Sequence, residues 1–215
     1  MGCPLHTRSV RRSRFLVVRN QRKPVGPVLE TVVVRMLAVL GIFFSGVNQR
    51  VEMSLPVVEL RQERIAVSCV LQRPFSDDLL NIIDSGTPVE LTFICRLRKA
   101  DGTPASPPDT TVKHRVVKDL ATGTYEITLG RRTLIASRFT EYSQIFRLET
   151  VPLWPVGAIN PGMSCFVEVS AALEPIHIHA TGQQYDLMAL WNYRVPKNRS
   201  AAFTRAMLER RQVGP

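Results

Sequence analysis

The chain lacks the short motifs that identify common catalytic folds. It has no Gly-x-Gly-x-x-Gly loop and no Gly-x-x-x-x-Gly-Lys-Ser/Thr motif, so the phosphate cradle of dinucleotide-binding and P-loop proteins is missing. No serine lies in a Gly-x-Ser-x-Gly turn, the signature of an α/β-hydrolase. These absences favour a non-enzymatic protein, and we expect no cofactor.

Cysteine is scarce, and no two cysteines have the close Cys-x-x-Cys spacing of a redox or zinc site. Cys69, Cys95 and Cys165 fall in apolar stretches whose alternate residues are expected to face inward. Because three cysteines cannot all pair with one another, two alternatives stay open. Either all three are buried thiols, or two form a disulfide and the third is spare.

Acidic residues are nearly absent from the first 35 positions, which hold eight basic residues and only one acid, Glu30. This leader therefore supplies +7 of the net charge of +10, and the rest of the chain is only mildly basic. A nucleic-acid surface needs its Lys and Arg clustered on the folded domain. Nucleic acid is accordingly not an expected partner of the domain, although the basic C-terminal tail keeps an anionic-surface or nucleic-acid binder as an alternative.

A long hydrophobic run is also missing, since the longest apolar stretch is the nine residues Met36–Phe44. About 20 residues are needed to cross a membrane. A basic leader followed by a short apolar core is typical of a secretory signal or an N-terminal anchor. We expect residues 1–50 to have this role, which places the following domain on the periplasmic side of the cytoplasmic membrane, anchored or secreted.

The middle of the chain alternates apolar and polar residues, which predicts half-buried strands. Strands are expected at 65–72, 88–98, 112–118, 124–129, 163–171 and 187–193, with a further extended segment at 151–156. A short amphipathic helix is expected from Ser76, as N-cap, to Gly86. The spacing of apolar residues predicts a second short helix over 139–146.

This pattern predicts a mainly β fold, an antiparallel immunoglobulin-like β-sandwich with two short helices and an N-terminal signal or anchor helix. The sandwich domain is expected to cover 51–195. Residues 196–215 are expected to form a basic tail. The tail is either an amphipathic helix on an anionic membrane or partner, or a frayed terminus.

The order of these features resembles an uncharacterised bacterial envelope family, a domain of unknown function with an N-terminal signal or anchor. The similar features are the helix 76–86 leading into Val89–Cys95, the strand Tyr125–Leu129, the helix near 139–146 and the strand 162–173. The resemblance implies an all-β envelope domain. It carries over no functional residue.

His177 and His179 are the most metal-like pair in the sequence, because residues two apart on a strand point to the same face. A metal site needs at least a third ligand, and no motif places one. The alternative is an exposed histidine face of an edge strand. His114, between Lys113 and Arg115, is expected to face the core or to lie half exposed.

Aromatic residues offer the other candidate site. Trp154, Trp191 and Tyr193 are of the types common both in sandwich cores and in binding hot spots. A core position is the alternative to a binding role for each tryptophan. The sequence thus predicts an exported or membrane-anchored interaction module that binds an envelope protein partner, with a metal-binding envelope protein as the alternative.

Overall fold

The computed structural model describes residues 50–138, 143–178 and 182–212, and this part of the chain is mainly β. Every strand pair in it is antiparallel, which confirms the expected class. The predicted signal or anchor segment lies outside the described residues. No helix within the described ranges is long and apolar enough to cross a membrane.

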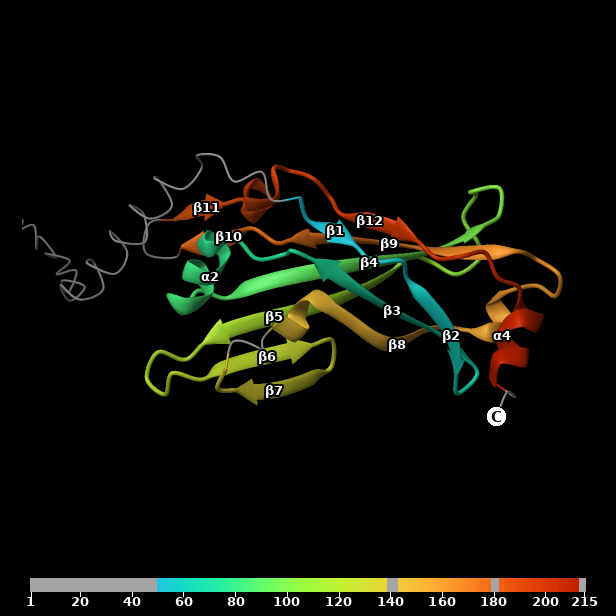
Figure 1. Ribbon diagram of the computed structural model, residues 1–215, viewed down its shortest axis with the longest axis horizontal. Helices are drawn as coiled ribbons and strands as arrows, with labels where there is room; N and C mark the ends of the chain where they lie inside the picture. Colours follow the sequence, from blue (N-terminus) through green and yellow to red (C-terminus); the bar gives the residue numbers. More distant parts are fainter. Residues whose placement is uncertain (1–49, 139–142, 179–181, 213–215) are drawn as a thin grey trace, which may run out of the picture.

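The larger sheet has six strands and forms the long body of the molecule (Figure 1). Its central strand β4 pairs with β9 over nine residues and with β5 over seven. The spatial order is β12 (Lys197–Arg199), β9 (Cys165–Leu173), β4 (Val89–Lys99), β5 (Thr110–Lys118), β6 (Tyr125–Leu129) and β7 (Arg132–Ala136).

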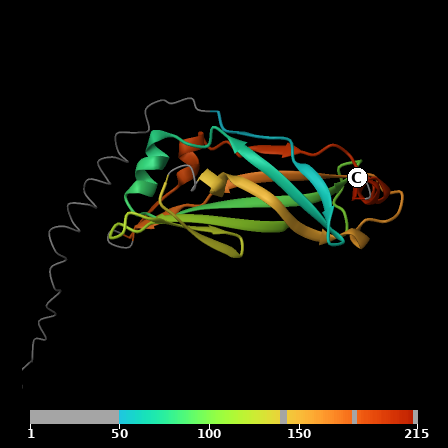
Figure 2. The ribbon, with the colours of Figure 1, turned by 60° about the horizontal axis from the view of Figure 1, so that its bottom comes forward.

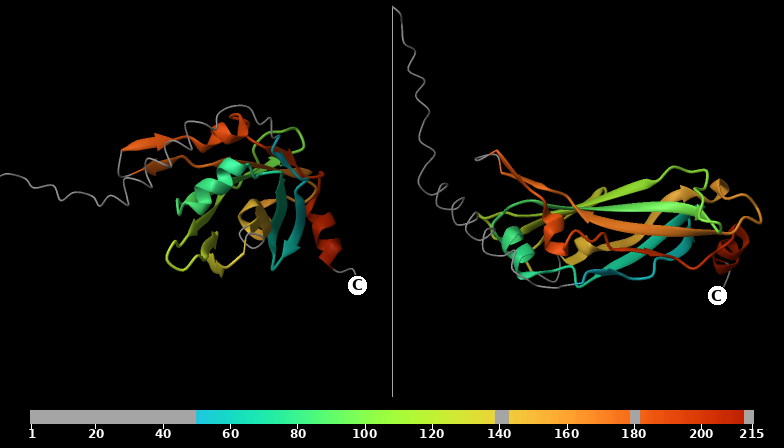
Figure 3. Two further views of the ribbon diagram at one scale, coloured as in Figure 1. Left: turned by 60° about the vertical axis from the view of Figure 1, so that its left-hand side comes forward. Right: turned by 90° about the horizontal axis from the view of Figure 1, so that it is seen from above.

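The smaller sheet is built around β3 (Arg64–Gln72). One edge of β3 pairs with β1 (Glu52–Met53) and then β2 (Val57–Arg61), and the other edge pairs with β8 (Arg147–Pro155). This sheet lies across one face of the larger sheet, consistent with a β-sandwich (Figures 2 and 3). A separate hairpin, β10 (Ile176–Ile178) with β11 (Gln183–Tyr185), follows β9.

The core lies between the two sheets and is filled by alternate residues of their strands, as the period of a strand requires. The inward residues of β4 and β3 are all buried: Val89, Leu91, Phe93, Cys95 and Leu97 on one side, and Ile65, Val67, Cys69 and Leu71 on the other. The alternation read from the sequence in these two segments therefore identifies the core face correctly.

The first predicted helix is confirmed as α2 (Asp77–Asp84). The Ser76 hydroxyl accepts a hydrogen bond from the Leu79 N–H at 3.2 Å, which satisfies one of the unpaired donors of the first turn. Gly86 follows the helix at φ +81°, a conformation that favours glycine. At the second predicted helix the structure has a 3₁₀ turn, η1 (Ser143–Phe146), and residues 139–142 lie outside the described part.

The strand predicted at 187–193 is wrong, because this segment forms a 3₁₀ helix, η3 (Leu187–Trp191). The Asp186 side chain caps it by accepting from the Met188 N–H, and Asn192 ends it in the left-handed conformation at φ +52°. Leu187 and Trp191, four residues apart, are the two buried members. Residues four apart lie on the same face in a helical turn and also in a strand. The spacing of these two residues in the sequence therefore did not distinguish a helix from a strand.

The boundary predicted at residue 195 is also wrong, because the chain beyond it belongs to the fold. β12 adds the last strand to the larger sheet, and α4 (Arg205–Gln212) packs against β2. Phe203 and Leu208 are buried. The apolar side of the tail thus faces this domain, and neither a frayed terminus nor a helix with a free apolar face describes it.

His114 lies in the core, which confirms the first of the two positions expected for it. The ring is 2 % exposed and packs edge-on against Phe93, and its Nδ1 lies 2.8 Å from the Ile145 carbonyl oxygen. Burial lowers the pKa of His114, and this outweighs the opposing effects of the Ile145 carbonyl and the Glu149 carboxylate. The imidazole is therefore held neutral in the folded protein.

Acidification is expected to destabilise the fold through His114. The unfolded chain protonates this histidine near its ordinary pKa of 6.5, whereas the folded protein does so only at lower pH. The free energy of unfolding should thus fall as the pH drops below about 6.5, by up to ~1.4 kcal/mol per pH unit. Urea unfolding between pH 7.5 and 5 measures this. The slope should flatten in His114→Asn, and an unchanged slope in that variant would contradict the assignment.

Candidate interaction groove

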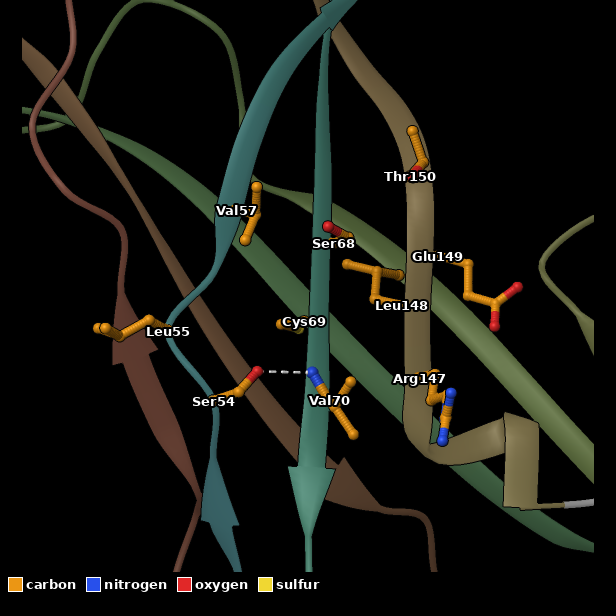
Figure 4. A pocket seen from close by; sticks show the side chains of 10 residues that line it. All are labelled: Ser54, Leu55, Val57, Ser68, Cys69, Val70, Arg147, Leu148, Glu149 and Thr150. Atoms are coloured by element: carbon orange, nitrogen blue, oxygen red, sulfur yellow. Dashed lines mark hydrogen bonds between the residues drawn. The ribbon is translucent and has the colours of Figure 1, made fainter. Parts of the chain in front are cut away.

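A groove of about 390 Å³ lies on the outer face of the smaller sheet, on the side away from the core. We call it the β3 groove, and Figure 4 shows its lining from close by. The lining residues are Ser54, Leu55, Val57, Ser68, Cys69, Val70, Arg147, Leu148, Glu149 and Thr150. They come from β3 and from both of its neighbours, so the groove depends on how these strands pair.

The first wall is a break between β1 and β2. Met53 pairs with Leu71, but pairing resumes as Val57 with Ser68, so the β1–β2 side holds one residue more than a regular ladder. At the break the Ser54 N–H donates to the Val70 carbonyl, and the Ser54 hydroxyl accepts from the Val70 N–H, both at 2.9 Å. The proline that follows, Pro56, has no N–H to continue the ladder.

The second wall is a bulge in β8. Val67 pairs with Val151 and Cys69 with Leu148, so two residues, Glu149 and Thr150, oppose the single residue between them on β3. Thr150 has φ +43°, which is strained for a β-branched residue. A bulge of this kind bends the strand and increases its twist. The two neighbours of β3 therefore leave the regular ladder at adjacent positions, β8 opposite Ser68 and the β1–β2 side opposite Cys69 and Val70, and the sheet surface is hollowed there.

The groove surface is more apolar than the outer face of a solvated sheet usually is. Leu55 and Val57 are 69 % and 59 % exposed, and Val70 is also exposed. The polar groups are the Ser54, Ser68 and Thr150 hydroxyls and, at the rim, Arg147 and Glu149. Figure 4 shows the Glu149 side chain directed away from β3. An exposed apolar surface with a polar rim is typical of a protein-interaction site.

The lining of the groove holds few titratable groups. It contains one carboxylate, that of Glu149, and no histidine. Burial raises the pKa of the Cys69 thiol to about 12, which keeps it protonated and a poor nucleophile. The groove offers contact area and a few hydrogen-bonding groups.

The three cysteines of the domain are free and buried, so the structure shows the first of the two alternatives left open by the sequence. Burial raises the pKa of Cys95 to about 12 as well, and it raises that of Cys165. All three side chains therefore behave as small apolar core residues.

The two predicted tryptophans are core residues. The Trp154 indole N–H donates to the Pro108 carbonyl at 3.0 Å, and that of Trp191 donates to the Pro74 carbonyl at 3.2 Å. Both rings are buried, so neither presents a surface to a partner. Tyr193 is 67 % exposed, and the predicted aromatic binding role rests on it alone. None of these three residues lines the β3 groove.

The predicted metal ligands are only partly described. His177 is exposed on β10 and lines a second hollow, of about 370 Å³, together with Glu90 and Glu174. His179 lies outside the described residues. Among the residues that are described, no group of three or more His, Cys, Asp or Glu could hold a metal ion. Metal binding at His177 and His179 stays a prediction.

The sequence did not reveal the β3 groove. Its signal on the β1 side is Ser-Leu-Pro at 54–56, where a proline interrupts an otherwise strand-like stretch. On the β8 side no sequence pattern indicates the bulge, because Glu149 and Thr150 are ordinary strand residues. A hollow formed by two register shifts requires the pairing of three strands to be known.

The fold and the groove define a mainly β, antiparallel domain with an exposed apolar hollow on its smaller sheet. Comparison with family models, with curated proteins and with solved structures finds no match to this chain.

Proposed function

We propose that this chain is a non-enzymatic, immunoglobulin-like interaction module of the bacterial cell envelope, and that it binds a protein partner in the β3 groove. In this proposal the apolar segment around residues 32–47 acts as a signal or anchor, and the sandwich domain lies on the periplasmic side of the cytoplasmic membrane. The observation that supports it best is the exposed apolar lining at Leu55, Val57 and Val70.

The groove favours an extended protein segment that carries branched apolar side chains next to an acidic residue. Burying one such side chain contributes about 1.5–3 kcal/mol. Arg147 lies opposite Val70 on the same strand pair, is exposed, and forms no ion pair with a described residue. A carboxylate of the partner would complement this guanidinium, which adds specificity at the rim.

The groove also lies close, along the chain, to the proposed anchor. Seven residues separate position 47 from Leu55 at the groove, and an extended chain spans at most ~3.6 Å per residue. The groove would therefore face the layer just outside the membrane. A partner anchored in the same membrane fits this position better than one that is freely diffusing.

Site-specific photocrosslinking in intact cells tests the proposal. A photoreactive phenylalanine replaces Val57 in one variant and Leu120, a similarly exposed residue in the β5–β6 turn, in the control. We expect position 57 to give a discrete adduct with one envelope protein that the control does not form, and the adduct to disappear with Arg147→Glu. Equal adducts from both positions, adducts with lipid, or a cross-link within the chain or to a second copy would contradict it.

A further inference from the structure

β7 (Arg132–Ala136) is an edge strand of the larger sheet. It pairs only with β6 within the described part of the chain, in a regular register without a shift. The two strands are joined by the two-residue turn Gly130–Arg131, with Gly130 at φ +59°. The bottom edge of the larger sheet in Figure 1 is this strand.

The register decides which main-chain groups of β7 are unpaired. In a two-residue hairpin the closing pair, here Leu129 with Arg132, is hydrogen-bonded, and hydrogen-bonded pairs recur at every second residue. Thr133 and Ile135 therefore direct their N–H and C=O groups away from β6. No described residue is hydrogen-bonded to these groups. Two donors and two acceptors are left at strand spacing along this edge.

In the two larger sheets, the outer edges of β2, β12 and β8 are protected. α4 covers the edge of β2, and the Asn198 side chain on β12 donates to the Met53 carbonyl of β1 at 2.9 Å. The outer edge of β8 carries two prolines, Pro152 and Pro155. The centre of β7, Thr133-Leu134-Ile135, has no proline, no charge and no bulge. It also exposes the Ile135 side chain on the outer face of the sheet.

The charged side chains next to β7 determine which kind of added strand this edge favours. Arg131, Arg132 and Arg138 are exposed, and none forms an ion pair with a described residue. If two copies paired antiparallel about Leu134, Arg132 of each copy would lie opposite Ala136 of the other and diagonally across from its Arg138. Like charges across strands destabilise pairing. The arginines thus oppose pairing with a second copy and favour an acidic strand.

We propose that β7 accepts an extended acidic peptide as an added strand of the larger sheet. The peptide backbone pairs with the free N–H and C=O groups of Thr133 and Ile135, one of its side chains packs on Ile135, and its carboxylates pair with the flanking arginines. This site is separate from the β3 groove, so either site can be tested without the other.

Fluorescence anisotropy with a capped eight-residue peptide of alternating valine and glutamate, added to the full-length chain, tests this proposal. We expect saturable binding that weakens at least tenfold between 50 and 300 mM salt. The matching valine–lysine peptide should bind at least tenfold more weakly. Amide exchange at Thr133 and Ile135 should slow at least tenfold when the acidic peptide is bound.

Two pairs of variants locate the binding. Ile135→Pro removes one outward N–H and should weaken binding at least tenfold, whereas Ile135→Thr keeps that N–H and should change it less than fivefold. Charge reversal at Arg131 and Arg132 should also abolish binding. The same reversal at Arg210 and Arg211 on α4 should not. Binding that survives Ile135→Pro in a folded variant, equal binding of the basic peptide, absence of binding, or a dimer that Ile135→Pro dissociates would overturn the proposal.

Discussion

Replacing Trp191 by alanine is expected to lower the free energy of unfolding by about 3–5 kcal/mol. The side chain is only 2 % exposed, so truncation leaves a cavity in the core and leaves the Pro74 carbonyl without the indole donor that it accepts from at 3.2 Å. Urea unfolding followed by far-UV circular dichroism measures the change. An interaction residue on the surface would give a much smaller loss.

Tyr193→Ala is the control for this prediction. Tyr193 lies two residues along the chain and is exposed, and its replacement should change the free energy of unfolding by less than about 0.5 kcal/mol. If Trp191→Ala lowered the free energy of unfolding as little as Tyr193→Ala, the core position of the Trp191 ring would be wrong. Trp191 would then again be a candidate hot spot for binding.

Leu208→Ala is expected to cost about 2–5 kcal/mol, although it lies in a segment whose sequence looks like a basic tail. Leu208 is 1 % exposed, where α4 packs over β2. Met207, its neighbour, is 42 % exposed. Met207→Ala therefore serves as a matched control, with an expected loss below about 1 kcal/mol. The same unfolding measurement compares the two.

This pair of variants tests where the domain ends. Equal, small effects of Leu208→Ala and Met207→Ala would mean that α4 is an appendage with no share in the core. A large difference would mean that the folded domain extends at least to α4. In that case the edge of β2 depends on this helix for its cover, and removal of α4 should expose it to pairing with other chains.

The elements that could be predicted are those whose sequence pattern matches their burial. β4 alternates over its whole length and lies at the centre of the larger sheet, with one face in the core. The helix α2 carries its own cap at Ser76 and its apolar residues at helical spacing. In both, local preference and tertiary packing agree, so the pattern alone was sufficient.

The elements that were missed are held by their neighbours. β12 consists of Lys-Asn-Arg, which has no apolar alternation, and it is a strand because β9 supplies its hydrogen bonds. β7 begins with a charged residue and is short, so its pattern is weak. β1 and β2 together form one edge of β3, but the break at 54–56 divides their pattern into two pieces too short to recognise.

The β3 groove could not be predicted from the sequence for a related reason. A groove that arises from an inserted residue in β1–β2 and a bulge in β8 exists only once three strands are in register. The sequence instead indicated aromatic residues as the candidate binding site, since tryptophan is common at interfaces. In this fold the tryptophans are large core residues, and the exposed apolar contact surface consists of Leu55, Val57 and Val70, which no motif distinguishes.

The most direct test of the proposed role is the affinity of the protein cross-linked at position 57, once purified, for three forms of the full-length chain. Val57→Asp places a charge in the β3 groove, and Leu120→Asp places one on a similarly exposed site outside it. We expect Val57→Asp to weaken binding at least tenfold, about 1.4 kcal/mol, and Leu120→Asp to leave it within twofold of the unsubstituted chain. Equal affinities for all three forms would show that the β3 groove is not the binding site.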